Sequence, residues 1–549
     1  MSLGINRKFI LYTLGVYLIF TIVIAFSGYF NIGLLSDDYL NLFDALHSSL
    51  RDKLTGHLPF TNGLHLRPVY YLSMQFSDYI HNMLGLSYDN FINYRIENLL
   101  LYFVLAFTAG KIVLMQTGKL SLSVLTSLSI IVFPNNINNI CWTAARVDIL
   151  CGIFYVLTIL CTILSIKKKC TLQVILSVIF LNLALLSKET ALTVPFIVLL
   201  MCYYFFGKES IKENKLVFIL QFAILAMYLS GRIFFLHNNL AEAGNLFQSS
   251  PLANIPGVAA RSLIALTIPL DYLTLTLFMT DKESSVLIYL ACLYGAVFYL
   301  VYAMIKNVVY KYMLQLLLLG AVLIIPYIYV GYIRPQMILI PFVILLIQLF
   351  SIYNQQAQFN IHFKKHYLKY FYAVSLVFWC YWSIVSINNW SFAYEKGKQD
   401  IISLTSVNIT PHRQTIIIGN PGRFKNTLMF DKLTGSYNYW KNKSSVINDT
   451  LNDLIQTGAL KEIDVGAVLK YVQTAPNVFE ISTLNRSQFF YIEGLDNERI
   501  KSGFSNSYMD VQFSDFNFFN KPAKLTLKIL SPLVDCYIAG GFSFERITN

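Results

Sequence analysis

The sequence predicts a polytopic α-helical membrane protein that ends in a soluble domain. Of its 549 residues, 56% are hydrophobic and only 13% are charged, with a mean hydropathy of +0.54. Soluble domains carry about 25% charged residues. In addition, apolar runs of membrane length recur through the first 390 residues and then stop.

Runs of about 20 apolar residues predict the membrane spans. The first run is too long for a signal peptide and lacks a small-residue cleavage site, so it should remain as an anchor. The apolar segment 261–279 is interrupted by Pro269 and Asp271, and we expect it to be re-entrant or interfacial. About eleven crossings are predicted, near 8–27, 96–115, 120–134, 148–166, 172–187, 190–206, 216–236, 285–305, 313–331, 336–352 and 370–388.

Basic residues predict the orientation, because they concentrate in cytoplasmic loops. They place the N-terminus in the cytoplasm, and the loops 28–95 and 237–284 and the C-terminus outside. The net charge of +12 therefore reflects topology, and nucleic acid is not an expected partner. The residues that agree are Arg7, Lys8, Lys111, Lys119, Lys167, Lys168, Lys169, Lys208, Lys212, Lys215, Lys306, Lys311, Lys364, Lys365 and Lys369.

Two domains are predicted, a transmembrane domain over 1–390 and an extracytoplasmic mixed α/β domain over 391–549. In the second domain polar and apolar residues alternate, as in "RQTIIIGNPGRF", "AKLTLKILSP" and "CYIAGGFSFERI". This alternation is typical of strands. One amphipathic helix is predicted near 444–458.

Two adjacent carboxylates, Asp37 and Asp38, follow the first span in "GLLSDDYL". They could cap a helix, because Ser and Asp oxygens bind the backbone N–H groups at a helix start. They could also provide a general base, because like charges side by side raise the pKa of one of them. Tyr39 and His65, in the same loop, are candidate supporting residues.

Several basic residues are predicted at the outer end of the helices, where such residues are otherwise rare. Their side chains suit phosphate oxygens. The candidates are Arg67 in "HLRPVYY", Arg95 in "NYRIENLL", Arg146 in "TAARVD", Lys188 in "LLSKET" and Arg334 in "GYIRPQ". The alternative is a structural ion pair, with Asp78 or Glu97 for Arg67 and Arg95, Asp148 for Arg146, and Glu189 for Lys188.

The order of these motifs resembles the GT-C superfamily of membrane glycosyltransferases. It is most similar to the branch of the protein O-mannosyltransferases and the bacterial aminoarabinose transferase of lipid A. The resemblance covers residues 1–236: the acidic pair, the "RP" segment, the "P…W…R.D" segment and "LLSKE…P".

The resemblance implies an inverting enzyme. It would move a sugar from a polyprenyl-phosphate donor to a glycan, lipid or protein acceptor on the outer face. Asp37 or Asp38 would deprotonate the acceptor hydroxyl. The donor phosphate would be held by Lys188, Arg67, Arg146 and Arg334.

The sequence departs from the mannosyltransferases at the acidic pair, which is usually Asp-Glu in that family. The choice of base therefore stays open here. The oligosaccharyltransferase branch has D-x-D metal sites, and "SDDY" lacks that spacing, so no metal or other cofactor is expected.

Two other functions stay open. A polymerase or ligase would move a whole oligosaccharide from a diphosphate carrier. A transporter or flippase could also line a cavity with arginines, but no inverted repeat is visible. With Cys536 as the single cysteine of the outer domain, a bacterial inner membrane is favoured over the endoplasmic reticulum.

Overall fold

The computed structural model describes most of the helical part of the chain and much of the C-terminal part. The predicted span 285–305 and His65 lie outside the described residues. The described residues are 7–60, 66–236, 251–267, 310–330, 334–356, 365–407, 414–424, 427–429, 433–443, 451–459, 464–465, 467–485, 488–491, 504–515, 522–532, 534–539 and 543–547.

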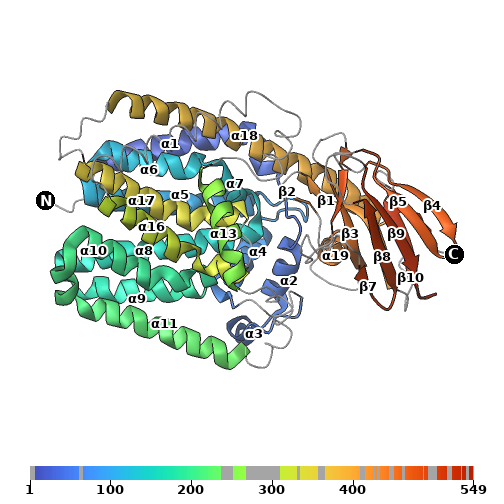
Figure 1. Ribbon diagram of the computed structural model, residues 1–549, viewed down its shortest axis with the longest axis horizontal. Coiled ribbons are helices and arrows are strands. Elements are labelled where there is room, and N and C mark those ends of the chain that lie inside the picture. The colour runs from blue at the N-terminus through green and yellow to red at the C-terminus, as the bar shows by residue number, and fades with distance from the viewer. Residues whose placement is uncertain are drawn as a thin grey trace.

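The chain is mostly helical, and its helices form a bundle beside a C-terminal group of strands (Figure 1). The helices are α1 Arg7–Phe26, α2 Asp38–His47, α3 Leu50–Thr55, α4 Pro68–Met83, α5 Ile92–Thr117, α6 Leu120–Val132, α7 Pro134–Cys141, α8 Arg146–Lys168, α9 Thr171–Leu185, α10 Val194–Glu213, α11 Lys215–Leu236, α13 Pro251–Thr267, α16 Tyr310–Val330, α17 Leu339–Gln356, α18 Lys365–Leu404 and α19 Leu433–Asn442. Short 3-10 turns η1 to η4 cover Tyr29–Asn31, Thr143–Ala145, Glu189–Thr193 and Pro335–Ile338.

Several of these helices could cross a membrane. Within the described part of the chain, six are long and apolar enough, or seven if α6 and α7 form one bent span. The prediction of a membrane protein is therefore supported, but the predicted eleven spans are not found. Helix α9 has 15 residues, which gives it a length of about 22 Å against about 30 Å of hydrocarbon. The apolar part of α16, Tyr312–Ile328, is also short.

The predicted span 370–388 lies inside α18, which has 40 residues and is not among the six helices. A helix of this length extends about 60 Å. In Figure 1 it runs along the bundle and continues to the strands. Helix α18 therefore continues from the bundle towards the strands and ends at Leu404, ahead of β1.

Helices α2, α4 and α7 lie at the end of the bundle nearest the strands, which we call the sheet end (Figure 1). Prolines begin several segments there, with Pro68 in the first turn of α4, Pro134 in that of α7 and Pro335 in that of η4. Proline suits this position because its missing N–H would be unpaired anyway. These starts place Arg67 and Arg334 immediately before a helix.

The predicted polar hairpin after the third span is the buried helix α7. It bends by 63° from α6, and all eight of its residues are buried. Its asparagines bind neighbouring segments: Asn135 donates to the Ala265 carbonyl at 2.8 Å, and Asn138 accepts from Trp390 Nε1 at 2.8 Å. Protein therefore surrounds the polar segment, as its position in a membrane helix pair requires.

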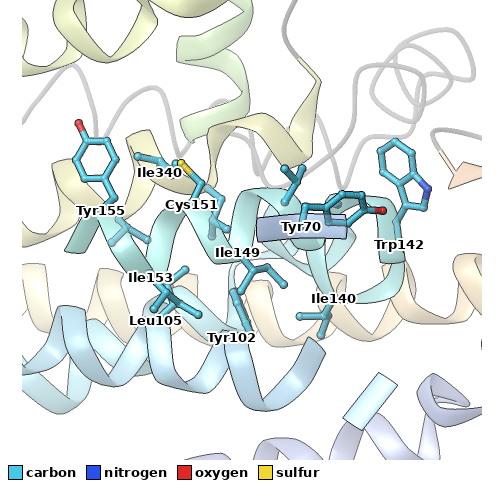
Figure 2. Close-up of a cluster of buried hydrophobic side chains, with 14 of the residues drawn as sticks. Tyr70, Tyr102, Leu105, Ile140, Trp142, Ile149, Cys151, Ile153, Tyr155 and Ile340 are labelled. Carbon is cyan, nitrogen blue, oxygen red and sulfur yellow. The ribbon is translucent and has the colours of Figure 1, made fainter. Parts of the chain in front are cut away.

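The apolar core fills the space between α5, α8 and α17. Gly152 allows close packing, because a Cβ at that position would lie 3.2 Å from the Leu105 side chain. Figure 2 shows this cluster, with Tyr155 and Cys151 towards one side of the view and Tyr70 and Trp142 towards the other. Tyr70 and Trp142 thus join the core to the sheet end.

The C-terminal strands form two sheets. The first has the order β11-β10-β1-β3-β6, with β2 also paired to β1, and the second has the order β4-β5-β9-β8-β7. Strand β1 is parallel to both β10 and β3. The strands are β1 Gln414–Phe424, β2 Thr427–Leu428, β3 Leu451–Ala459, β4 Lys470–Ala475, β5 Val478–Ser482, β6 Gln488–Tyr491, β7 Phe504–Ser505, β8 Met509–Asp515, β9 Lys524–Ile529, β10 Val534–Ala539 and β11 Phe544–Arg546.

The helix predicted near 444–458 is wrong where the structure describes it. Residues 451–459 form β3, and the helix lies earlier, at α19. The apolar residues Leu451, Leu454 and Ile455 fit a helical period. Pairing with β1 decides for a strand, because periodicity alone cannot distinguish the two in a short segment. The predicted outer loop 237–284 likewise contains helix α13 in its described part.

Candidate functional site

The acidic pair stands at the start of α2. Ser36 has a left-handed φ of 54°, and the turn at this residue leads directly into the helix. Asp37 occupies the N-cap position, but its side chain makes no capping hydrogen bond within the described part of the chain. The simple capping role is therefore not the one that the Asp37 carboxylate performs here.

Asp38 is fully buried and held by two backbone groups from different segments. Leu35 N–H donates to its Oδ2 at 3.0 Å, and Ala144 N–H donates to its Oδ1 at 2.5 Å. Burial raises the pKa of Asp38 to about 7; the charge of Arg95 opposes this rise, and the charge of Asp37 adds to it. Asp38 is therefore the carboxyl that holds its proton up to near neutral pH.

Three buried polar atoms of the pair and of the segments that bear on it have no hydrogen-bond partner among the described residues: Asp37 Oδ1, the hydroxyl of Tyr70, and Nε1 of Trp142, two residues before Ala144. Burial first, and then the charges of Asp38 and Asp37, raise the pKa of Tyr70 well above its ordinary value. Its hydroxyl therefore keeps its proton. One acceptor and two donors without partners are unusual in a folded protein and suit a ligand that carries hydroxyl groups.

Arg95 holds the two segments that bind Asp38. It is fully buried, and it donates to the Gly33 carbonyl at 2.9 Å and to Thr143 Oγ1 at 2.7 Å. It also donates to the carbonyls of Ile140 and Cys141. Its two terminal nitrogens thus bind three carbonyls and one hydroxyl, and only its buried Nε has no partner among the described residues, so we do not place Arg95 at the phosphate. Neither Asp78 nor Glu97, the predicted partners, is among these acceptors.

We expect Arg95→Lys to lower the free energy of unfolding by roughly 3 kcal/mol, because an ammonium group cannot reproduce the planar fork of donors. Thermal unfolding in detergent, followed by tryptophan fluorescence, measures the change. Arg51→Lys is the control, because Arg51 is exposed on α3 and such changes stay within about 0.5 kcal/mol. Equal melting temperatures for the two variants would contradict the structural role of Arg95.

Arg67 and Arg232 share one carboxylate. Glu189 Oε2 lies 3.0 Å from Arg67, and its Oε1 lies 3.4 Å from Arg232. All three side chains are about one-fifth exposed. Arg67 Nε is buried without a partner among the described residues. Two guanidinium groups against one carboxylate leave an excess positive charge at the sheet end.

The sequence reasoning missed Arg232. This residue lies near the end of α11, inside the predicted span 216–236. A signal was available, because an ionisable residue within an apolar helix marks a functional or paired position. Arg232 is further placed by the Tyr228 hydroxyl, which accepts from its guanidinium at 3.1 Å.

Lys188 and Arg146 are also paired. Lys188 Nζ lies 2.6 Å and 2.7 Å from the two oxygens of Asp148, which replaces the predicted partner Glu189. Arg146 lies 3.3 Å from Glu97 and donates to Asn98 and Ser77, both at 2.5 Å. Arg146 and Asp148 therefore do not form the pair predicted for them.

The remaining candidates take other positions. Tyr39 is fully buried and its hydroxyl accepts from Trp440 Nε1 at 2.9 Å. Arg334 is half-buried at the start of η4, where its carbonyl accepts from Met337 N–H. Among the described residues, no group of three His, Cys, Asp or Glu side chains is arranged to hold a metal ion; the absence of a cofactor stays a prediction.

No protein-family model and no curated protein matches the chain.

Proposed function

We propose that the chain is a membrane glycosyltransferase that moves a sugar from a polyprenyl-phosphate donor to a hydroxyl acceptor, with inversion at the anomeric carbon. The observation that best supports this proposal is the unpartnered Asp37 oxygen, buried beside a second carboxylate at one end of a bundle of apolar helices. The resemblance of the motifs to GT-C enzymes favours the same function.

Asp37 is the better candidate for the base. A base needs a lone pair that can reach the acceptor proton, and Asp37 Oδ1 has no partner among the described residues. Asp38 already accepts one N–H on each oxygen. Its role is to fix the first turn of α2.

Arg67 and Arg232 are the better candidates for the donor phosphate. In the reaction the acceptor oxygen bonds to the anomeric carbon and its proton passes to Asp37. The bond from that carbon to the phosphate oxygen breaks, and polyprenyl phosphate leaves with an additional negative charge. Guanidinium groups beside that oxygen would stabilise the transition state more than the ground state. Lys188 and Arg146 are less suitable, because carboxylates already neutralise them.

The active site would then face the side opposite the basic loops. Lys167 Nζ donates to the Met115 carbonyl at 2.9 Å, which places the C-terminal ends of α8 and α5 together. Their N-terminal ends meet at the sheet end through Arg146 and Asn98. We propose that the sheet end is extracytoplasmic, in the inner membrane of a bacterium. The acceptor would be a glycan, lipid or protein of the cell envelope.

The test is sugar transfer by the purified protein in lipid nanodiscs from a panel of radiolabelled polyprenyl monophosphate and diphosphate donors. Turnover of a monophosphate donor is expected. Consumption of diphosphate-linked oligosaccharides alone would favour the polymerase or ligase, and consumption of neither would overturn both functions.

Arg232→Gln is expected to lower kcat/KM for the donor by about 100-fold, because the developing phosphate charge loses one of two guanidinium groups. Arg232→Lys should recover part of this loss. Steady-state kinetics with varied donor measures both effects. Arg261→Gln, an exposed arginine of α13, serves as the control. An unchanged kcat/KM in Arg232→Gln would place the phosphate elsewhere.

A further inference from the structure

The C-terminal part of the chain reaches the helix that carries the acidic pair. Helix α19 packs on α2, where Trp440 Nε1 donates to the Tyr39 hydroxyl at 2.9 Å. The rings of Tyr439 and Tyr39 lie 5.1 Å apart. Tyr39 directly follows Asp38 and is fully buried. The residue next to the acidic pair therefore contacts α19 of the C-terminal part of the chain.

The same aromatic residues bind the loop between α4 and α5. The Tyr439 hydroxyl donates to the Tyr88 carbonyl at 2.9 Å, and the rings of Tyr88 and Trp440 meet edge to face at 5.6 Å. Lys398 of α18 pairs with Asp89 at 3.1 Å and lies over the Trp440 ring at 5.1 Å. The Trp440 ring thus contacts Tyr88 and Lys398, while its Nε1 donates to Tyr39.

Helix α18 also packs against the turn before α2. A Cβ at Gly33 would lie 2.3 Å from the ring of Tyr394 on α18, so the two are in close contact. The Gly33 carbonyl accepts from Arg95 on the other side. The start of α2 therefore lies between the helical bundle and the elements that carry the C-terminal sheets.

We propose that the C-terminal domain controls the acidic pair: Trp440 is a positioning residue whose bond to Tyr39 fixes the first turn of α2, and docking of α19 sets the carboxylates in their reactive position. A ligand that moves α19 would then change turnover without touching the carboxylates. The consequence for turnover rests on the proposed function, whereas the consequence for the order of α2 does not.

The charged and titratable groups that face Asp38 are Asp37, Arg95, Tyr39 and Tyr70. Replacing Trp440 leaves Asp37, Arg95 and Tyr70 in place but removes the hydrogen bond to the Tyr39 hydroxyl. Loosening of α2 admits water, which weakens the desolvation that raises the pKa of Asp38. Asp38 should therefore release its proton at lower pH, which a pH series of thermal unfolding measures.

The test compares Trp440→Phe, Tyr39→Phe and the double variant in nanodiscs, with hydrogen exchange of residues 35–45 followed by mass spectrometry. Each single variant should speed exchange there by about fivefold, the equivalent of one lost hydrogen bond. The double variant should add little, because both changes remove the same bond. The control is Tyr471→Phe, which loses a 2.6 Å bond to Glu545 in the same domain.

With the donor that the wild type uses, kcat should fall about fivefold in Trp440→Phe, with KM unchanged. If Trp440→Phe does not fold, Tyr39→Phe carries the test, because it leaves α19 intact. Unchanged exchange in residues 35–45 would overturn the proposal whatever the activity. Faster exchange with unchanged kcat would overturn the control of the site. If the wild type turns over no donor, the proposed function fails, and exchange still decides whether α19 orders α2.

Discussion

Asp37→Asn is expected to lower sugar transfer by about 10³-fold or more, because the acceptor hydroxyl then lacks its general base. The melting temperature should change little. Asp37 Oδ1 has no hydrogen-bond partner among the described residues, and the side chain makes no capping bond there. An asparagine of nearly the same shape therefore removes no bond that holds the fold. Turnover and thermal unfolding, measured on the same preparation, show both effects.

Asp38→Asn tests whether the Asp38 carboxylate holds the structure of the site. Its amide nitrogen would face either Leu35 N–H or Ala144 N–H, which now donate to the two carboxylate oxygens. An unpaired buried donor costs about 1–3 kcal/mol, so this variant should lose stability as well as turnover. Asp52→Asn is the comparison, because the Asp52 carboxylate caps α3 through Ser49 and lies outside the acidic pair, so this variant should lose some capping stability but no turnover.

The raised pKa of Asp38 should make the stability of the protein depend on pH. Its pKa of about 7 in the folded protein lies above the ordinary value of about 3.9 for an unfolded chain. Between these two values the folded state binds the extra proton, so stability falls as pH rises, by up to about 1.4 kcal/mol per pH unit. Asp38→Asn should remove this contribution, whereas Asp400, whose pKa burial raises to about 8, keeps its own. If Asp37→Asn and Asp38→Asn both keep full turnover, the acidic pair has only a structural role. If Asp38→Asn alone loses turnover, Asp38 is the base.

The sequence predicted the elements of the site better than their partners. An acidic pair after an apolar run, and prolines beside Arg67 and Arg334, are local patterns, and the structure places them at helix starts. Ion pairs depend on tertiary contacts. Arg67 meets Glu189 across 122 residues of sequence, and no local pattern distinguishes that partner from Asp78 or Glu97.

Local sequence patterns also did not predict which polar side chains are buried. Arg95 lies among residues typical of a helix facing a polar surface, yet it is fully buried and bound to carbonyls from two other segments. The predicted number of spans was wrong for a related reason. Hydropathy measures the composition of a segment, whereas the length of helix α9 depends on the residues at which the helix begins and ends. The helix near 444–458 failed because strand pairing with β1 outweighed local periodicity.

The pair formed by Lys188 and Asp148 allows a structural cation to be distinguished from a phosphate ligand. Its side chains are 10% and 3% exposed. Removing one charge should cost about 3–5 kcal/mol, because the other is left buried and unpaired. We therefore expect both Lys188→Gln and Asp148→Asn to melt at much lower temperature. Glu209→Gln, which breaks an exposed pair with Lys212, should stay within about 1 kcal/mol.

The double variant Lys188→Gln with Asp148→Asn decides whether Lys188 has a structural role or binds the phosphate. Two amides can hydrogen-bond to each other without a buried charge, so we expect the melting temperature to return close to that of the wild type. Because Asp148 already neutralises Lys188, we expect turnover to return as well, to within about tenfold of the wild type. Recovered stability without turnover would instead mean that Lys188 leaves Asp148 to bind the phosphate, and that Arg67 and Arg232 do not act alone.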